Sequence, residues 1–156
     1  MTPDQRRRFD HTLSAIRDAE RGPTAEALAA APTLDLWRPM VNQRGMPVLW
    51  GEVSGHPKLG ADLITTSRLL ALDRERGWAR SANRWYGLGR PFSDFETDLA
   101  RSLGHDDAKA GFFGFELAGF TPIDDPASLD EILAAYLMLM RRFEADFGHN
   151  QTRDRP

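Results

Sequence analysis

The spacing of apolar side chains predicts a helix near the start of the chain. Three apolar residues recur at helical spacing, namely Phe9, Leu13 and Ile16. Ahead of them, Thr2 and Gln5 have the spacing of a capping box, which satisfies the first backbone N–H groups of a helix. A second, shorter helix is expected over residues 25–31, because Thr24 can cap it and a proline follows it.

The strongest helical pattern lies near the C-terminus, where one apolar face continues for about five turns. Its members are Leu129, Ile132, Leu133, Tyr136, Leu137, Met140, Phe143 and Phe147. Ser128 and Glu131 have capping-box spacing at its start, and Gly148 is expected to end it.

A third long helix is expected just after the middle of the chain. Ser93 and Glu96 have capping-box spacing, and Gly104 is expected to end the helix. An apolar stripe connects these two ends, formed by Phe95, Leu99 and Leu103. The following residues 110–117 are too rich in glycine and too short to assign to a helix or a strand.

Between these helices the pattern changes to short runs of β-branched and aromatic residues. We predict strands over residues 47–53, 63–67 and 78–86, the last with a bulge near Ala82. The connections between them are short, which favours antiparallel pairing. Residues 33–45 are expected to be irregular, because proline and glycine interrupt them.

These elements predict an α+β fold in which a small three-stranded antiparallel sheet is flanked by N-terminal helices and packed by C-terminal helices. We expect one domain over residues 1–148 and a flexible tail over residues 149–156, which has no apolar anchor. Hydrophobic residues make up 41% of the chain, which is enough for a core and argues against global disorder.

The composition excludes several classes of protein and site. The chain has no cysteine, so it has no disulfide scaffold, thiolate metal site or cysteine nucleophile. No apolar run approaches the roughly 20 residues of a membrane helix, and no apolar run follows the charged N-terminus as in a signal peptide. We therefore expect a cytoplasmic protein with no membrane contact.

The net charge of −3 conceals an uneven distribution. Residues 56–91 carry a net charge of +4, almost entirely from arginine, whereas residues 92–156 carry −7. The two regions could pack against each other, or the basic region could meet an anionic partner.

Three short motifs in the predicted sheet resemble those of a group of short bacterial proteins of unknown function. The motifs are the Gly55-His56-Pro57 turn, the Ile64-Thr65-Thr66-Ser67 strand and the Arg84-Trp85-Tyr86-Gly87-Leu88-Gly89 strand end. The resemblance covers about a quarter of the chain. It implies a shared small-sheet core, and it implies no mechanism.

His56 is the first candidate for chemistry, because histidine titrates near neutral pH. A general base needs a partner, and Ser54, Asp62 and Ser67 lie nearby in sequence. No serine has the G-x-S-x-G surroundings of a nucleophile elbow, so the favoured alternative is that His56 braces its turn.

Two further groups are candidate binding residues. Thr65, Thr66 and Ser67 could bind a phosphate, although threonine-rich strands more often pair their hydroxyls with the backbone. The second group interleaves arginine with aromatic residues, as nucleic-acid-binding faces do: Trp78, Arg80, Arg84, Trp85 and Tyr86. The alternative is that these aromatic side chains fill the core and the arginines pair with the acidic C-terminal third.

We expect no metal and no cofactor, since the four histidines lack ligand spacing and no phosphate-binding glycine loop is present. The favoured function is a non-enzymatic binding or regulatory protein that acts through a protein partner. The alternatives are nucleic-acid binding through the arginine and aromatic residues, and a small hydrolase-like enzyme that uses His56. An exposed apolar patch, for example around residues 112–120, would favour the protein partner.

Overall fold

The computed structural model describes residues 1–104 and 117–153, with side chains up to residue 147. Within that part of the chain, helices and strands follow in this order: α1 (Pro3–Arg21), α2 (Ala25–Ala30), β1 (Thr33–Asn42), β2 (Pro47–His56), β3 (Gly60–Thr65), β4 (Leu69–Asp73), β5 (Trp78–Ser81), β6 (Trp85–Leu88), α3 (Phe92–Ser102), β7 (Phe120–Pro122) and α4 (Pro126–Arg153).

The strands form one mixed seven-stranded sheet with the order β3-β2-β1-β6-β5-β4, and β7 also pairs with β1. All pairings are antiparallel except that of β1 with β6, where Thr33 lies opposite Gly87. The predicted α+β class is therefore confirmed. The predicted small three-stranded antiparallel sheet is wrong.

One reason for the larger sheet is that residues 78–86 do not form a single strand. They form the β5–β6 hairpin, in which Ala79 pairs with Tyr86 and Arg80 pairs with Trp85. The turn has no glycine or proline to mark it and is held by the hydroxyl of Ser81, which accepts a hydrogen bond from the backbone N–H of Arg84. Residues 69–73, which carried no prediction, form the edge strand β4.

A second reason is that residues 33–42, which were expected to be irregular, form the long strand β1. Leu34 and Trp37 both join the main core although they are three residues apart, which a regular strand does not allow. A bulge between Asp35 and Arg38 supplies the extra residue, and Leu36 within it has a φ of 52°. The bulge removes the alternation by which a strand is recognised.

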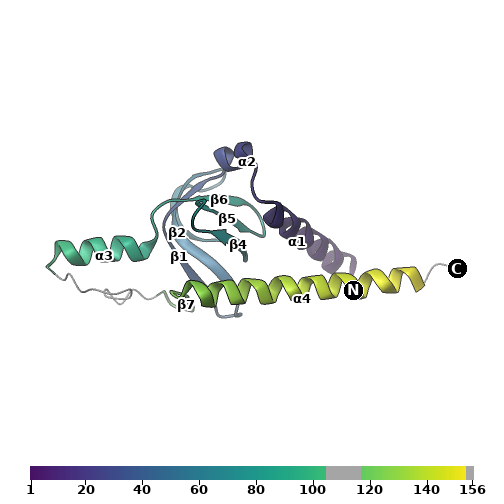
Figure 1. Cartoon of the computed structure of the whole chain (residues 1–156). Coiled ribbons are helices and arrows are strands. Elements are labelled where there is room, and N and C mark those ends of the chain that lie inside the picture. The colour runs from purple at the N-terminus through teal and green to yellow at the C-terminus, as the bar shows by residue number, and fades with distance from the viewer. Residues whose placement is uncertain (105–116, 154–156) are drawn as a thin grey trace.

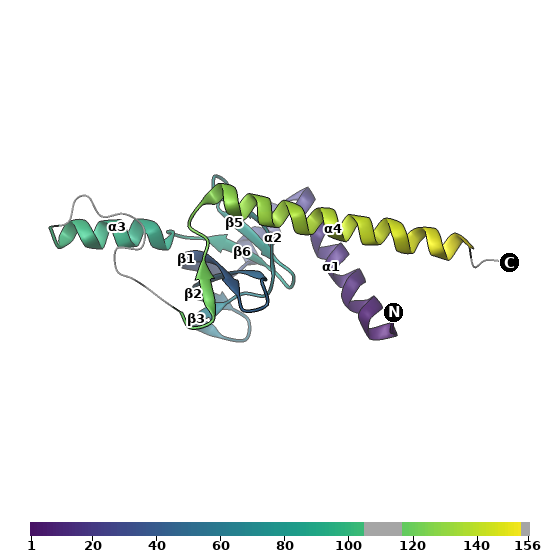
Figure 2. The ribbon, with the colours of Figure 1, turned by 90° about the horizontal axis from the view of Figure 1, so that it is seen from below.

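α4 covers one face of the sheet and continues well beyond it (Figures 1 and 2). The main core lies between α4 and the sheet and is formed by Leu34, Trp37, Leu49, Val53, Leu69, Ala79, Tyr86, Ile123, Leu129 and Leu133. At the edge of the sheet, Met140 of α4 packs with Leu13 and Ile16 of α1 and with Leu70 of β4. On the opposite face, Phe92 at the start of α3 packs with Trp50 at a ring separation of 5.8 Å.

The starts of the first two helices are as predicted. Thr2 and Gln5 form the capping box of α1, and the side chain of Thr24 caps α2. α3 also ends as predicted, because Gly104 adopts a φ of 84° just after the helix. These ends are set by residues close in sequence, which is why local spacing identifies them.

The starts of the two later helices differ from the prediction. α3 begins at Phe92 without a side-chain cap, and Glu96 is buried rather than capping. The buried face of α3 carries Phe92, Glu96 and Ala100, so the predicted stripe, which ends in Leu103, is not the buried one. Which residues of α3 are buried is determined by the face that the helix packs against β1.

α4 begins with Asp125, whose carboxylate accepts hydrogen bonds from the backbone of Ala127 and the hydroxyl of Ser128. Ser128 and Glu131 therefore do not form the predicted capping box. Gly148 does not end the helix, which continues to Arg153. That the tail after residue 148 is flexible stays a prediction. Among the residues described, no helix is long and apolar enough to cross a membrane.

Candidate functional site

The predicted arginine and aromatic residues do not share one exposed face, because they belong to a hairpin. Trp78 and Arg80 lie on one side of β5, and the cross-strand neighbour Trp85 lies against both, with a 5.3 Å ring separation from Trp78. The guanidinium of Arg80 lies 5.4 Å from the ring of Trp85. Tyr86 faces the opposite side and is buried in the main core.

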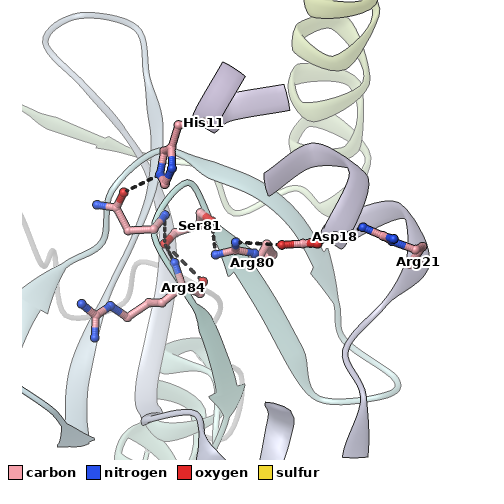
Figure 3. A network of polar contacts seen from close by, with 7 residues as sticks. His11, Asp18, Arg21, Arg80, Ser81 and Arg84 are labelled. Carbon is pink, nitrogen blue, oxygen red and sulfur yellow. Dashed lines mark hydrogen bonds and ion pairs between the residues drawn. The ribbon is translucent and has the colours of Figure 1, made fainter. Parts of the chain in front are cut away.

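Arg80 connects the hairpin to α1 (Figure 3). It is 8% exposed, its Nη2 donates to Asp18 at 3.4 Å, and its Nη1 donates to the backbone carbonyl of Ser81 at 3.0 Å. Asp18 also accepts a hydrogen bond from Arg21 at 3.1 Å. A guanidinium held in this way positions α1 on the sheet and is not presented to a phosphate.

Arg84 differs from Arg80, since its side chain points away from this network (Figure 3). Its guanidinium forms no ion pair with any residue that the structure describes. Its charge acts on His56, whose pKa is lowered first by partial burial and then by the positive charges of Arg84 and Lys58. Arg84 and His56 lie at the same end of the sheet, because Thr33 of β1 pairs with Ser54 of β2 and with Gly87 of β6.

His56 has the bracing role that was the favoured alternative to catalysis. Its Nδ1 accepts hydrogen bonds from the backbone N–H groups of Lys58 at 3.0 Å and Leu59 at 3.2 Å. No hydrogen bond joins it to a hydroxyl or a carboxylate among the described residues. The imidazole therefore holds the β2–β3 turn, and its lowered pKa agrees with a neutral ring that accepts at Nδ1.

The hydroxyls of the threonine-rich strand are also used locally. Thr66 is buried, and its Oγ1 accepts from the backbone of Leu49 at 3.0 Å and donates to the carbonyl of Ser67 at 2.8 Å. Thr65 is exposed at the end of β3, and Ser67 is half-buried. A binding role for Thr65, Thr66 and Ser67 stays a prediction.

Sequence reasoning missed a small polar cavity of about 50 Å³ at the β1 bulge. Its floor is Arg38, which is buried and makes two hydrogen bonds of 3.0 Å to the carboxylate of Asp124. Arg74 lies over the ring of Trp37, 5.1 Å from its centre, and the buried Glu96 completes the lining. Arg38 and Asp124 lie 86 residues apart, so no local pattern connects them.

The charged groups that line this cavity balance in sign, because two are guanidinium groups and two are carboxylates. Asp124 directly precedes the capping residue of α4, and the backbone N–H of the adjacent Ile123 donates to Pro39 of β1 at 2.9 Å. The Arg38–Asp124 ion pair and this backbone hydrogen bond therefore form the joint that fixes the start of α4 to β1. Within the described residues, no group of three or more histidine, aspartate or glutamate side chains could hold a metal ion.

The largest exposed apolar side chains of α4 lie away from this joint, near the middle of the helix. Met138 is 71% exposed, Leu139 46% and Phe143 42%. Phe143 was predicted to lie on the core face, and it instead lies at the border of that face. The core uses Leu129, Leu133 and Met140, which leaves a second face of α4 in contact with solvent.

We call that second face the outer face of α4 and define it by Glu131, Ala135, Met138, Leu139 and Arg142. All five residues are exposed. Glu131 and Arg142 form no ion pair with any residue in the described part of the chain, whereas Arg141 is paired with Glu20 of α1. The outer face is thus apolar in the middle and carries one unused charge of each sign.

A protein-family model matches residues 1–154 of the chain. The chain belongs to a family of unknown function, DUF6634. The comparisons with curated proteins and with solved structures found no match. The resemblance to proteins of unknown function is confirmed, while the shared turn and strand motifs and the bacterial origin stay predictions.

Proposed function

We propose that this chain is a binding protein of the bacterial cytoplasm, with a regulatory or adaptor role, that recognises another polypeptide through the outer face of α4. The observation that carries the proposal is the exposure of Met138 and Leu139 in the middle of a helix whose core face is already complete. Adjacent exposed apolar side chains of this size typically mark an interaction surface.

Met138 and Leu139 keep much of their apolar surface in water in the folded chain, so a partner can still bury it. Burying a side chain such as methionine or leucine stabilises a complex by roughly 1.5–3 kcal/mol. α4 has 28 residues, which corresponds to about 42 Å at 1.5 Å per residue, so it presents a long and straight surface. A partner helix can lie along such a surface.

The other candidate functions have less support. Nucleic-acid binding needs Arg80 and Tyr86 at the surface, and both side chains are buried. Hydrolysis needs His56 beside a nucleophile, and its Nδ1 is occupied by two backbone N–H groups. The five residues of the outer face, by contrast, are all exposed to solvent.

Site-specific photo-cross-linking in the native host tests this proposal. A photoreactive phenylalanine analogue is placed at Met138, and the matched control places it at Leu63, which is also exposed but lies on β3. We expect a discrete cross-linked polypeptide from position 138 and none from position 63. An absence of polypeptide adducts at position 138, or equal adducts at both positions, would overturn the proposal, and a nucleic-acid adduct at position 138 would favour the alternative.

A further inference from the structure

We infer that the polypeptide recognised by the outer face of α4 is a second copy of this chain, packed antiparallel across a two-fold axis. This inference rests on the proposed function and names the partner of the same surface. Glu131, Ala135, Met138 and Arg142 follow one another at intervals of four, three and four residues. That spacing is the heptad seam along which two helices pack side by side.

This row of residues is complementary to the same row of a second helix that runs in the opposite direction. If the two-fold axis passes between residues 136 and 137, Ala135 lies opposite Met138 of the second copy, so a small side chain meets a large one at each side of the axis. A two-fold interface uses the same patch on both subunits, so it needs this kind of self-complementarity.

The charges distinguish the antiparallel arrangement from the parallel one. Glu131 and Arg142 are equally far from the proposed axis, so each lies opposite the other residue of the second copy. This forms two identical ion pairs from charges that form no ion pair among the described residues of one copy. In a parallel pair, Glu131 would lie opposite Glu131, and Arg142 opposite Arg142, which is repulsive.

The length of the helix is sufficient for a dimer contact. With this axis, residue 126 of one copy lies opposite residue 147 of the other, so the overlap spans residues 126–147 of both. That overlap is about 33 Å long, or about three heptads. The core face of α4 stays on the sheet and on α1, so the dimer requires no change in the fold.

The test is sedimentation velocity of the full-length chain across a range of concentrations. We expect the wild-type chain to dimerise reversibly. Each single change, Glu131→Arg or Arg142→Glu, replaces two attractions with two repulsions and is expected to raise the dimer Kd at least about tenfold. Glu75→Arg and Arg8→Glu make charge changes of the same size at exposed positions in the β4–β5 turn and on α1, outside the outer face of α4, and are expected to leave the Kd unchanged.

The decisive result comes from combining the charge changes. An equimolar mixture of the Glu131→Arg and Arg142→Glu chains is expected to form a heterodimer, because opposite charges then face each other at both ends. The double variant in one chain is expected to dimerise like the wild type. If the mixture and the double variant stay as weak as the single variants, the antiparallel pairing is overturned.

Cysteine cross-linking reports the direction of the helices independently, because the chain has no cysteine of its own. Ala135→Cys and Met138→Cys chains are expected to cross-link faster with each other than with themselves. Faster cross-linking between identical positions would overturn the antiparallel arrangement. If the folded wild-type chain stays monomeric while position 138 cross-links to a different protein in the host, this inference fails and the proposed function stands.

Discussion

Replacing Asp124 with alanine tests whether the ion pair at the β1 bulge is the joint that holds α4. The side chain of Arg38 is 6% exposed and that of Asp124 is 45% exposed, and the two are joined by two hydrogen bonds of 3.0 Å. The change removes the bidentate carboxylate and leaves the guanidinium buried.

The size of the effect follows from this burial. Removing one partner of a buried ion pair typically costs about 3–5 kcal/mol, because the other charge stays out of water. Asp124 is nearly half exposed, so water replaces part of the lost interaction. We therefore expect the free energy of unfolding to fall by about 2–3 kcal/mol.

Urea-induced unfolding, followed by circular dichroism, measures this loss. With a slope of about 2 kcal/mol per molar urea, the midpoint is expected to fall by about 1–1.5 M. Asp10→Ala is the matched control, since the Arg6–Asp10 pair is exposed on both sides and should contribute less than about 0.5 kcal/mol. Arg38→Met combined with Asp124→Ala removes both charges and is expected to recover part of the loss.

An Asp124→Ala chain that is no less stable than the Asp10→Ala chain would contradict this role of the ion pair. Arg38 would then be solvated where it lies, and the joint would not depend on Asp124.

Three further predictions concern the core and the titrating groups. In the urea assay, Leu133→Ala removes a buried side chain and is expected to cost about 2–4 kcal/mol, whereas Met138→Ala on the outer face is expected to cost less than about 0.5 kcal/mol in the monomer. Arg84→Gln is expected to raise the pKa of His56 toward its ordinary value of 6.5, as measured by NMR titration. Because folding lowers the pKa of His56, the contribution of this histidine to folding stability is present above pH 6.5 and is lost as the pH falls. Burial raises the pKa of Tyr86 above 10, so folding stability is lost as the pH rises past 10, and Tyr86→Phe is expected to abolish that loss in an unfolding series.

The helices of the fold could be predicted from sequence because their signals are local. Thr2 and Gln5 lie three residues apart and define the start of α1 without help from the rest of the chain. The start of α4 was predicted less well, because Ser128 and Glu131 also fit the capping pattern. The actual cap, Asp125, lies beside Asp124, which is placed by its contact with Arg38 of β1.

The strands were harder to predict because a bulge and a turn alter their pattern. The bulge places Leu34 and Trp37 on the same face of β1, so alternation fails there. In the β5–β6 hairpin the turn over residues 81–84 contains no glycine or proline, which made two strands resemble one. The pairing of β1 with β6 connects residues more than fifty positions apart, which no local window covers.

The candidate site could be predicted only in part, because long-range contacts decide which of its residues stay exposed. The spacing of Glu131, Ala135, Met138 and Arg142 is present in the sequence, but the predicted core face was broader than the observed one. Which face of α4 stays open depends on where the sheet and α1 pack, and these contacts are long-range. Arg80 looked available for nucleic acid because its partner, Asp18, lies 62 residues away.

NMR of methionine methyl groups in the wild-type chain can detect a dimer built on the outer face of α4. Met138 and Met140 are two residues apart on α4, with Met138 on the outer face and Met140 buried against α1. Between about 10 µM and about 1 mM, a weak dimer passes from mostly monomer to mostly dimer. We predict that the Met138 methyl signal shifts over this range while that of Met140 stays constant. A Met138 signal that does not change with concentration, or a Met140 signal that shifts equally, would contradict a dimer built on the outer face of α4.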